Sequence, residues 1–444
     1  MTLYALSPLD GRYANQVSPL RDFCSEFAFH RSRVKVEIEF LASLSKTGIF
    51  SAETLSGYTS ALQNFTEEDA RKIQKYDETM RHDVKAIEYF LREKLPAEFH
   101  PYIHFGLTSE DVNNIAQALL LRDSREEVLL PALDELTNAL RDFAKAYRAL
   151  PLLARTHGQP AVPTTLGKEI AVYLARLLQC RAEIADHTFE AKLTGAVGNF
   201  NSWQAAAPEI DWISFNKEFL LSLQLQPNLL TTQILPYDNW IRYFDSLKLT
   251  NSILIDYAQD IWRYISDGTL KQKTVDHEVG SSTMPQKVNP IDFENAEGNL
   301  GVANALLTHY GQKLPISRLQ RDLSDSTVRR TFGVALGHTL LAWNNVTRGM
   351  SRIEANEEQI KQELNEHWEV ISEAAQTILR AAGQSNAYES LKAQTHGRVL
   401  SEASYRHWVE SLDIDQETRT RLANLSPESY IGLAVELVDE ATRS

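Results

Sequence analysis

The chain has 444 residues, of which 45 are basic and 59 acidic, so its formal net charge is −14. This excess of acid argues against a protein that neutralises many nucleic-acid phosphates, although a small anion held by a local group of Arg and Lys stays possible. The length suggests about three domains. The low number of turn-forming residues, 19 Gly and 15 Pro, favours long helices.

The beginning of the chain lacks the basic and apolar regions of a signal peptide. No apolar run approaches the roughly 18 residues that are needed to span a bilayer. Cys24 and Cys180 form neither a CxxC metal pattern nor a disulfide framework. We therefore expect a soluble cytoplasmic protein with neither a membrane nor a nucleic-acid partner.

The pattern along the chain predicts an all-α protein of three consecutive domains. Residues 1–111 hold short helical patches broken by Gly and Pro, and residues 365–444 are polar with short helical pieces. Residues 112–364 contain four apolar seams with a spacing near 3.5 residues, which is typical of long helices in a bundle. These seams run over 133–150, where Pro151 ends the helix, and over 166–184, 247–265 and 336–353. No strand pattern of useful length is present.

Six polar segments without helical periodicity interrupt these helices, namely residues 8–13, 79–85, 104–111, 155–160, 280–290 and 321–330. The most unusual is 280–290, GSSTMPQKVNP, which combines backbone N–H donors, Lys287 and a new helix predicted after Pro290. These features favour an anion-binding loop. Gln286 stands where a Walker A loop requires Gly, so that motif is excluded. A flexible surface turn is the alternative.

Two histidines lie where helices start or stop and could exchange protons near neutral pH, His82 and His157. Taken singly, a histidine is more often structural or solvated. The absence of HExxH, HxH and His/Cys clusters gives little support to a metal site, and the absence of GxSxG disfavours a serine hydrolase. Ser326 and Arg330, four residues apart, share a helix face on which a phosphate could bind. A solvated face paired with Asp322 and Asp325 is the alternative.

Segment 280–290 resembles the signature loop of the fumarase/aspartase superfamily, because Ser-Ser, Met-Pro, Lys and Asn-Pro all fall at the family spacing. With segments 8–13, 79–85 and 321–330, the similarity extends over almost the whole chain and points to the branch that cleaves adenylosuccinate in bacterial purine synthesis. The resemblance implies a three-domain fold with a long central helical bundle. It also implies a homotetramer with active sites shared between subunits, and no cofactor or metal. Gln286 departs from the usual family His, and Arg81 from a smaller polar residue.

The implied reactions are the elimination of fumarate from adenylosuccinate, giving AMP, and from the succinyl-carboxamide ribotide SAICAR, giving AICAR. The resemblance makes Ser281 the base and His157 the acid, with Lys287 supplying positive charge and Glu294 orienting His157 and keeping it protonated. It assigns Thr108, Ser109, Ser282, Lys287 and Asn289 to the succinyl carboxylates. It assigns Arg12, Tyr13, Arg321, Ser326 and Arg330 to the phosphate and ribose. The remaining implied pocket residues are Arg81, His82, Asp83, Gln233, Asn295, Thr327, Val328 and Arg329.

Two alternatives remain at this point. Another fumarate-releasing lyase of the superfamily, such as argininosuccinate lyase, would share the loop but would not need a phosphate anchor. The arginines at positions 12 and 321–330 favour the nucleotide. An inactive helical scaffold is disfavoured because Ser281, His157, Lys287 and Glu294 are all present.

Overall fold

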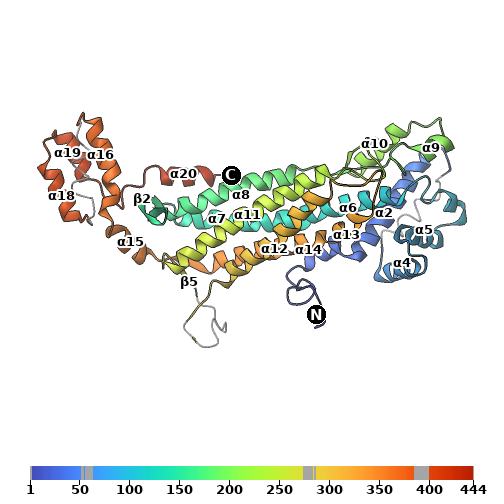
Figure 1. Ribbon diagram of the computed structural model, residues 1–444, viewed down its shortest axis with the longest axis horizontal. Helices are drawn as coiled ribbons and strands as arrows, with labels where there is room; N and C mark the ends of the chain where they lie inside the picture. Colours follow the sequence, from blue (N-terminus) through green and yellow to red (C-terminus); the bar gives the residue numbers. More distant parts are fainter. Residues whose placement is uncertain are drawn as a thin grey trace. The chain divides into compact units, whose positions relative to one another are not determined.

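The computed structural model describes residues 3–51, 55, 64–273, 284, 287–384 and 400–443. Helices dominate this part of the chain (Figure 1), so the all-α prediction is confirmed. The α-helices are α1 (Arg21–Cys24), α2 (Glu26–Ser45), α4 (Glu67–Met80), α5 (Asp83–Lys94), α6 (Ser109–Ser124), α7 (Leu130–Ala146), α8 (Leu166–Asp186), α9 (Asn201–Ala206), α10 (Trp212–Ser222), α11 (Asp238–Ser266), α12 (Ile291–Lys313), α13 (Ser324–Arg329), α14 (Phe332–Ser351), α15 (Glu357–Asn365), α16 (Ser372–Ala381), α18 (Glu402–Ser411), α19 (Gln416–Ala423) and α20 (Ala434–Ala441). Shorter helical turns are η1 (Ser18–Leu20), η2 (Ala97–Tyr102), η3 (Arg125–Leu129) and η4 (Trp368–Ile371).

The predicted seams form the buried faces of the long helices. Every seam residue of α8, from Leu166 to Ile184, is buried, and so are those of α14. Along α11 the seam is buried as far as Ile261. Period-3.5 patterning therefore predicted these helices because their apolar stripes are the surfaces that pack.

The chain forms two compact units, each built from segments that are far apart in the sequence. Unit 1 comprises Met1–Leu133, Cys180–Ser252 and Gly298–Trp343. Unit 2 comprises Asp134–Gln179, Ile253–Glu297 and Asn344–Ser444. The three consecutive domains expected from the sequence stay a prediction.

Unit 1 contains a core cluster in which α2, α4 and α5 pack together. Val34, Ile73, Ile87 and Phe90 are buried in it. The helix α2 begins after Ser25, whose side chain accepts the backbone N–H of Ala28, as an N-cap does.

Short strands are the departure from the predicted pattern. They are β1 (Pro151–Thr156), β2 (Gln159–Thr165), β3 (Glu190–Ala191), β4 (Gln226–Pro227), β5 (Leu270–Gln272) and β6 (Ile353–Ala355). The strands β1 and β2 form an antiparallel hairpin with Thr156 opposite Gln159. The helix α7 ends at Ala146, before the predicted stop at Pro151. The carbonyls of Tyr147 and Leu150 instead accept the N–H groups of Gly167 and Leu166 at the start of α8.

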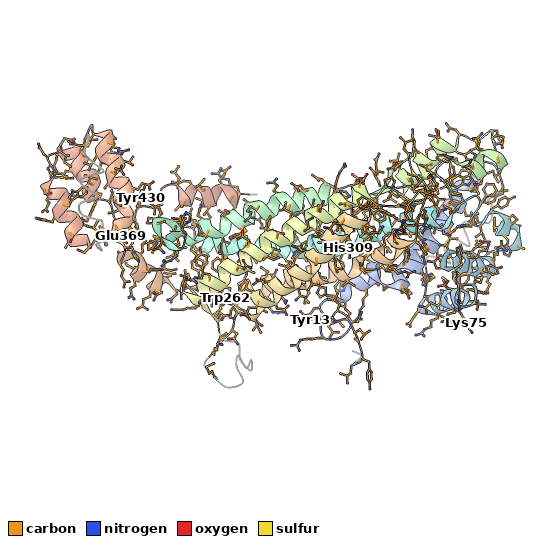
Figure 2. The ribbon with its side chains drawn as sticks, in the orientation of Figure 1. Tyr13, Lys75, Trp262, His309, Glu369 and Tyr430 are labelled. Atoms are coloured by element: carbon orange, nitrogen blue, oxygen red, sulfur yellow. The ribbon has the colours of Figure 1, made fainter. Side chains whose placement is uncertain are left out.

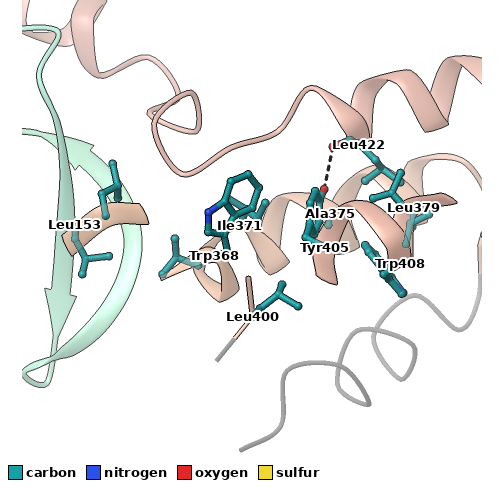
Figure 3. Packing of buried hydrophobic residues seen from close by; sticks show 12 residues of the cluster. Leu153, Trp368, Ile371, Ala375, Leu379, Leu400, Tyr405, Trp408 and Leu422 are labelled. Carbon is teal, nitrogen blue, oxygen red and sulfur yellow. Dashed lines mark hydrogen bonds between the residues drawn. The ribbon is translucent and has the colours of Figure 1, made fainter. Parts of the chain in front are cut away.

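Unit 2 contains a second core that joins the hairpin to the C-terminal helices (Figure 3). Leu153 of β1 packs in the same cluster as Leu364 and Trp368. The Tyr405 hydroxyl donates a 3.0 Å hydrogen bond to the Leu422 carbonyl. This packing gives the hairpin a fixed base.

Candidate active site

The structure places most of the predicted site residues in unit 1. These are Arg12, Tyr13, Arg81, His82, Asp83, Thr108, Ser109, Gln233, Arg321, Ser326, Thr327, Val328, Arg329 and Arg330. Unit 2 carries His157, Lys287, Asn289, Glu294 and Asn295. Ser281 and Ser282, together with Gln286, lie outside the described residues.

Thr108 and Ser109 stand at the start of α6. The Asp111 side chain accepts the Thr108 backbone N–H at 2.9 Å, which closes a capping box around the helix start. The other Asp111 oxygen accepts the N–H of Thr194 at 3.1 Å and lies 3.0 Å from the Lys192 ammonium group. Asp111 and Lys192 are fully buried. The hydroxyls at 108 and 109 therefore sit at a fixed helix N-terminus, where an anionic group is electrostatically favoured.

Glu110 is the centre of a buried ion-pair network that joins two of the predicted segments. Its oxygens accept bonds of 2.8 and 3.0 Å from Arg329 and one of 3.1 Å from the Tyr237 hydroxyl, and Arg321 lies 3.1 Å away. Arg321 also donates to the Gln233 Oε1 at 3.1 Å. Segments 104–111 and 321–330 and the residue Gln233 thus meet in unit 1.

Arg329 is an internal part of this network. Its side chain is 3% exposed and also pairs with Asp325 at 3.0 Å. Burial alone would lower the pKa of Arg329, but the Glu110 carboxylate raises it above its ordinary value. Asp325 therefore pairs inside the protein and is not part of a solvated face.

Arg330 follows α13 and its guanidinium is accessible. The side chain is 57% exposed, and Glu26, itself 69% exposed, is 3.5 Å from it. Ser326 is half-buried on α13, one turn earlier. The ion pairs of Arg329 anchor this short helix in unit 1. The Arg330 backbone N–H donates to the Ser326 carbonyl, so the two residues are one helical turn apart at the surface.

His82 joins two helices. Arg81 ends α4 with a left-handed backbone, φ 53°, and His82 is the N-cap of α5. The His82 Nδ1 accepts the Lys85 backbone N–H at 3.1 Å. The ring hydrogen of the neutral imidazole is then on Nε2, which gives the exposed side of the ring a donor.

Arg12 and Tyr13 lie in the turn before η1, and Tyr13 is labelled in Figure 2. The Arg12 side chain is exposed and its guanidinium carbon is 6.0 Å from the centre of the Tyr13 ring. Tyr13 packs beside Leu9 and Leu341. An arginine and an aromatic ring at this distance suit a phosphate and a planar group.

His157 occupies the tip of the β1–β2 hairpin. His157 and Gly158 have positive φ angles of 53° and 72°, as a two-residue type I′ turn requires. His157 is exposed, and Arg155 forms an ion pair with Glu363 of α15. With Leu153 buried at the base, the hairpin presents the imidazole away from its own core.

The residues after the signature loop begin α12. Lys287 is exposed and Asn289 is half-buried. Glu294 accepts a 3.1 Å hydrogen bond from the indole N–H of Trp262, a residue that is labelled in Figure 2. Within the described part of this one chain, no hydrogen bond joins Glu294 to His157, so the predicted orientation of His157 by Glu294 stays a prediction.

The sequence did not identify Glu110 or Tyr237 as site residues. Glu110 follows Ser109 directly in a polar segment, which was a usable signal. Tyr237 gave none. Among the described residues, no group of His, Cys, Asp and Glu is arranged to hold a metal ion. In the same part of the chain, no helix combines the length and the apolar character that a membrane crossing needs.

Comparison with known proteins identifies relatives over the whole chain. A family model described as "Lyase" matches residues 11–304, and one described as "Adenylosuccinate lyase C-terminal" matches residues 317–431. The chain is 47% identical to adenylosuccinate lyase of Haemophilus influenzae and 44% identical to that of Escherichia coli K12, over 99% of both chains in each case.

Two solved structures share the fold. A fumarate lyase from Mesorhizobium sp. BNC1 superposes with a TM-score of 0.78 at 18% identity, over 96% of this chain and 97% of the other. The 3-carboxy-cis,cis-muconate lactonizing enzyme from Pseudomonas putida gives 0.77 at 21% identity, over 96% of each chain. The predicted superfamily fold is therefore confirmed.

Proposed function

The chain belongs to the adenylosuccinate lyase family, and from this membership we propose that it eliminates fumarate from adenylosuccinate and from SAICAR. The products are AMP and AICAR, so the enzyme is a carbon–nitrogen lyase of purine nucleotide synthesis. The observation that carries the proposal is the match over 99% of the chain to adenylosuccinate lyases.

The reaction requires two proton transfers and the stabilisation of negative charge between them. A base takes the proton from the carbon beside a succinyl carboxylate, and the electron pair moves into that carboxylate to give a dianion. The carbon–nitrogen bond then breaks as an acid protonates the departing nitrogen. We assign the base to Ser281 and the acid to His157, as the resemblance implies.

A neutral serine is a weak base, so Ser281 needs a positive and water-poor environment. Lys287 and the backbone N–H groups of the signature loop would supply it and would also stabilise the dianion. Glu294 would stabilise the protonated His157. These roles are proposed by residue type and position in the family motif.

The two ends of the substrate are proposed to occupy different groups of residues. The start of α6, with Thr108 and Ser109, suits the succinyl carboxylates because N–H groups converge there. Arg330 and Ser326 suit the phosphate, since a guanidinium and a hydroxyl both hydrogen-bond to its oxygens. The contact of Arg321 with Glu110 supports a pocket that connects these groups.

The assembly proposed for the enzyme is a homotetramer whose sites combine residues of several subunits. His157 is exposed at the hairpin tip, which supports a role for it in a site completed by another copy. Leu249 of α11 and Val302 of α12, 50% and 47% exposed, leave apolar surface that neighbouring copies would cover.

No cofactor is required by this chemistry, because side chains carry both protons and no electrons are transferred. The cytoplasm is the proposed location, since nucleotide synthesis supplies the substrates there.

Purified protein incubated separately with adenylosuccinate, SAICAR and argininosuccinate tests the proposal. We expect fumarate from the first two and none from argininosuccinate, together with AMP in equal amount from adenylosuccinate. Fumarate from argininosuccinate alone, or from none of the three, would refute it. His157→Ala and Ser281→Ala should each lower kcat by about 10²–10⁴-fold while the fold is kept.

A further inference from the structure

Two of the proposed substrate-binding segments are attached to the same buried face of α2. Arg33 and Glu37 are four residues apart and therefore lie on one side of the helix. Their exposures are 3% and 2%, so both charges are within the core of unit 1. Charged side chains are rarely this buried unless partners hold them.

Arg33 connects α2 to the turn that carries His82. Its Nη2 donates to the Asp83 carboxylate, and its Nε donates to the Asn113 Oδ1 of α6 at 2.8 Å. The guanidinium carbon lies 3.7 Å from the centre of the Phe29 ring. Burial alone would raise the pKa of Asp83, but Arg33 and the Val84 N–H lower it below its ordinary value. Asp83, the residue next to His82, is thus held in place by Arg33 and stabilised as a carboxylate.

Glu37 connects α2 to the segment that leads to Thr108. Its carboxylate lies 2.5 Å from the Nδ1 of His104. Burial alone would lower the pKa of His104, but Glu37 raises it above its ordinary value. His104 has a left-handed backbone, φ 57°, and its carbonyl accepts the Leu107 N–H at 3.3 Å. The ion pair therefore holds a strained turn directly before Thr108.

Buried ion pairs are a costly way to fill a core. Apolar side chains of similar volume are often equally or more stabilising, because no charge has to leave water. An ion pair with hydrogen bonds does, however, fix the orientation of its partners. The planar guanidinium of Arg33 orients two partners at once, Asp83 and Asn113. Both partners lead to proposed substrate contacts.

We propose that Arg33 and Glu37 are positioning residues, which hold the pocket residue His82 at a fixed separation from the Thr108–Ser109 helix start that is assigned to the succinyl carboxylates. This rests on the proposed function. Neither side chain touches substrate. The nucleotide end is assigned to other residues. One of them, Arg330, interacts electrostatically with Arg33 and Asp83, but Arg33→Lys keeps the positive charge, so AMP binding should change little.

The test compares Arg33→Lys and Glu37→Gln with matched controls on the same helix. Arg31→Lys and Glu39→Gln serve as controls. Among the described residues, Arg31 hydrogen-bonds to the backbone carbonyl of Asp22 and to no side chain, and Glu39 is exposed. For each variant, kcat and KM for adenylosuccinate, the dissociation constants of AMP and fumarate, and the thermal unfolding midpoint are measured. Fumarate and AMP binding need no turnover.

Both test variants should lower kcat by about 10–100-fold and weaken fumarate binding, since a displacement of about 1 Å has this effect. AMP binding and both controls should match the wild type. Arg33→Met should lower kcat more than Arg33→Lys does. The double variant Arg33→Met with Asp83→Asn should lower kcat no more than the more impaired of the two single variants.

Folded variants with a lower unfolding midpoint but normal kcat and fumarate binding would show a structural role only and overturn the inference. Equal weakening of AMP and fumarate would also overturn it. An inactive wild type that binds neither ligand would instead refute the proposed function.

Discussion

Replacing Glu110 by Gln tests the buried network at the centre of unit 1. In the wild type, the carboxylates of Glu110 and Asp325 balance the guanidinium groups of Arg321 and Arg329. The amide keeps the size of the side chain and removes its charge. One positive charge then stays in the core without compensation.

The magnitude follows from burial. Glu110 is fully buried and Arg329 is 3% exposed, so water cannot solvate the Arg329 guanidinium after the Glu110 charge is removed. Breaking such a pair from one side costs about 3–5 kcal/mol. The matched control is Glu26→Gln, whose partner Arg330 is 57% exposed. An exposed pair contributes at most about 1 kcal/mol.

Urea unfolding followed by circular dichroism, at one protein concentration, measures both variants against the wild type. We expect Glu110→Gln to lose several times more unfolding free energy than Glu26→Gln. Equal losses in the two variants would refute the claim that the Glu110 network holds the segments of this site together.

Burial and the nearby Arg33 lower the pKa of His30 to about 4, so below its ordinary value of 6.5 the unfolded chain binds the proton first. As the pH is lowered from 6.5 to about 4, the unfolding free energy should therefore fall by up to roughly 3 kcal/mol. In urea titrations, His30→Gln should remove this part of the pH dependence of the unfolding free energy; an unchanged pH dependence would contradict the prediction. Gly158→Ala should cost about 1–2 kcal/mol of hairpin stability and lower kcat, whereas Gly158→Asn, which tolerates positive φ, should retain more activity; equal kcat values would show that the turn does not place His157. Ser326→Ala and Arg330→Ala should each weaken AMP binding by roughly 1.5–3 kcal/mol and leave fumarate binding unchanged in calorimetric titrations; equal losses for both ligands would assign these residues to structure.

Periodicity predicted the long helices well because one stripe of each is buried. The pattern failed after Tyr147, where Leu150 keeps the spacing but lies outside α7. Here the carbonyls of Tyr147 and Leu150 accept the N–H groups of Gly167 and Leu166. These contacts connect the two helices around the hairpin, and a local pattern cannot show them.

The hairpin itself was missed for a definite reason. Its strands contain Pro151, Pro160 and Pro163, which argue against a strand in any sequence-based prediction. The expectation that segment 155–160 interrupts the helices was correct, and His157 and Gly158 form the turn of the hairpin.

The candidate site could be assembled from the sequence only through the family motif. Glu110 lies beside Ser109 in a polar segment, but its partner Arg329 is 219 residues away in the sequence. Lys192 gave no sign that it is fully buried. Such long-range pairs arise from tertiary packing, so local spacing does not reveal them.

Mixing inactive His157→Ala and Ser281→Ala proteins tests most directly the central claim, that fumarate is eliminated at a site shared between copies. With subunit exchange allowed, about one site in four should receive both intact residues, by counting over a symmetric oligomer. We therefore predict that fumarate release from adenylosuccinate returns to roughly a quarter of the wild-type rate. No recovery, with exchange confirmed by mass spectrometry of labelled subunits, would contradict the claim.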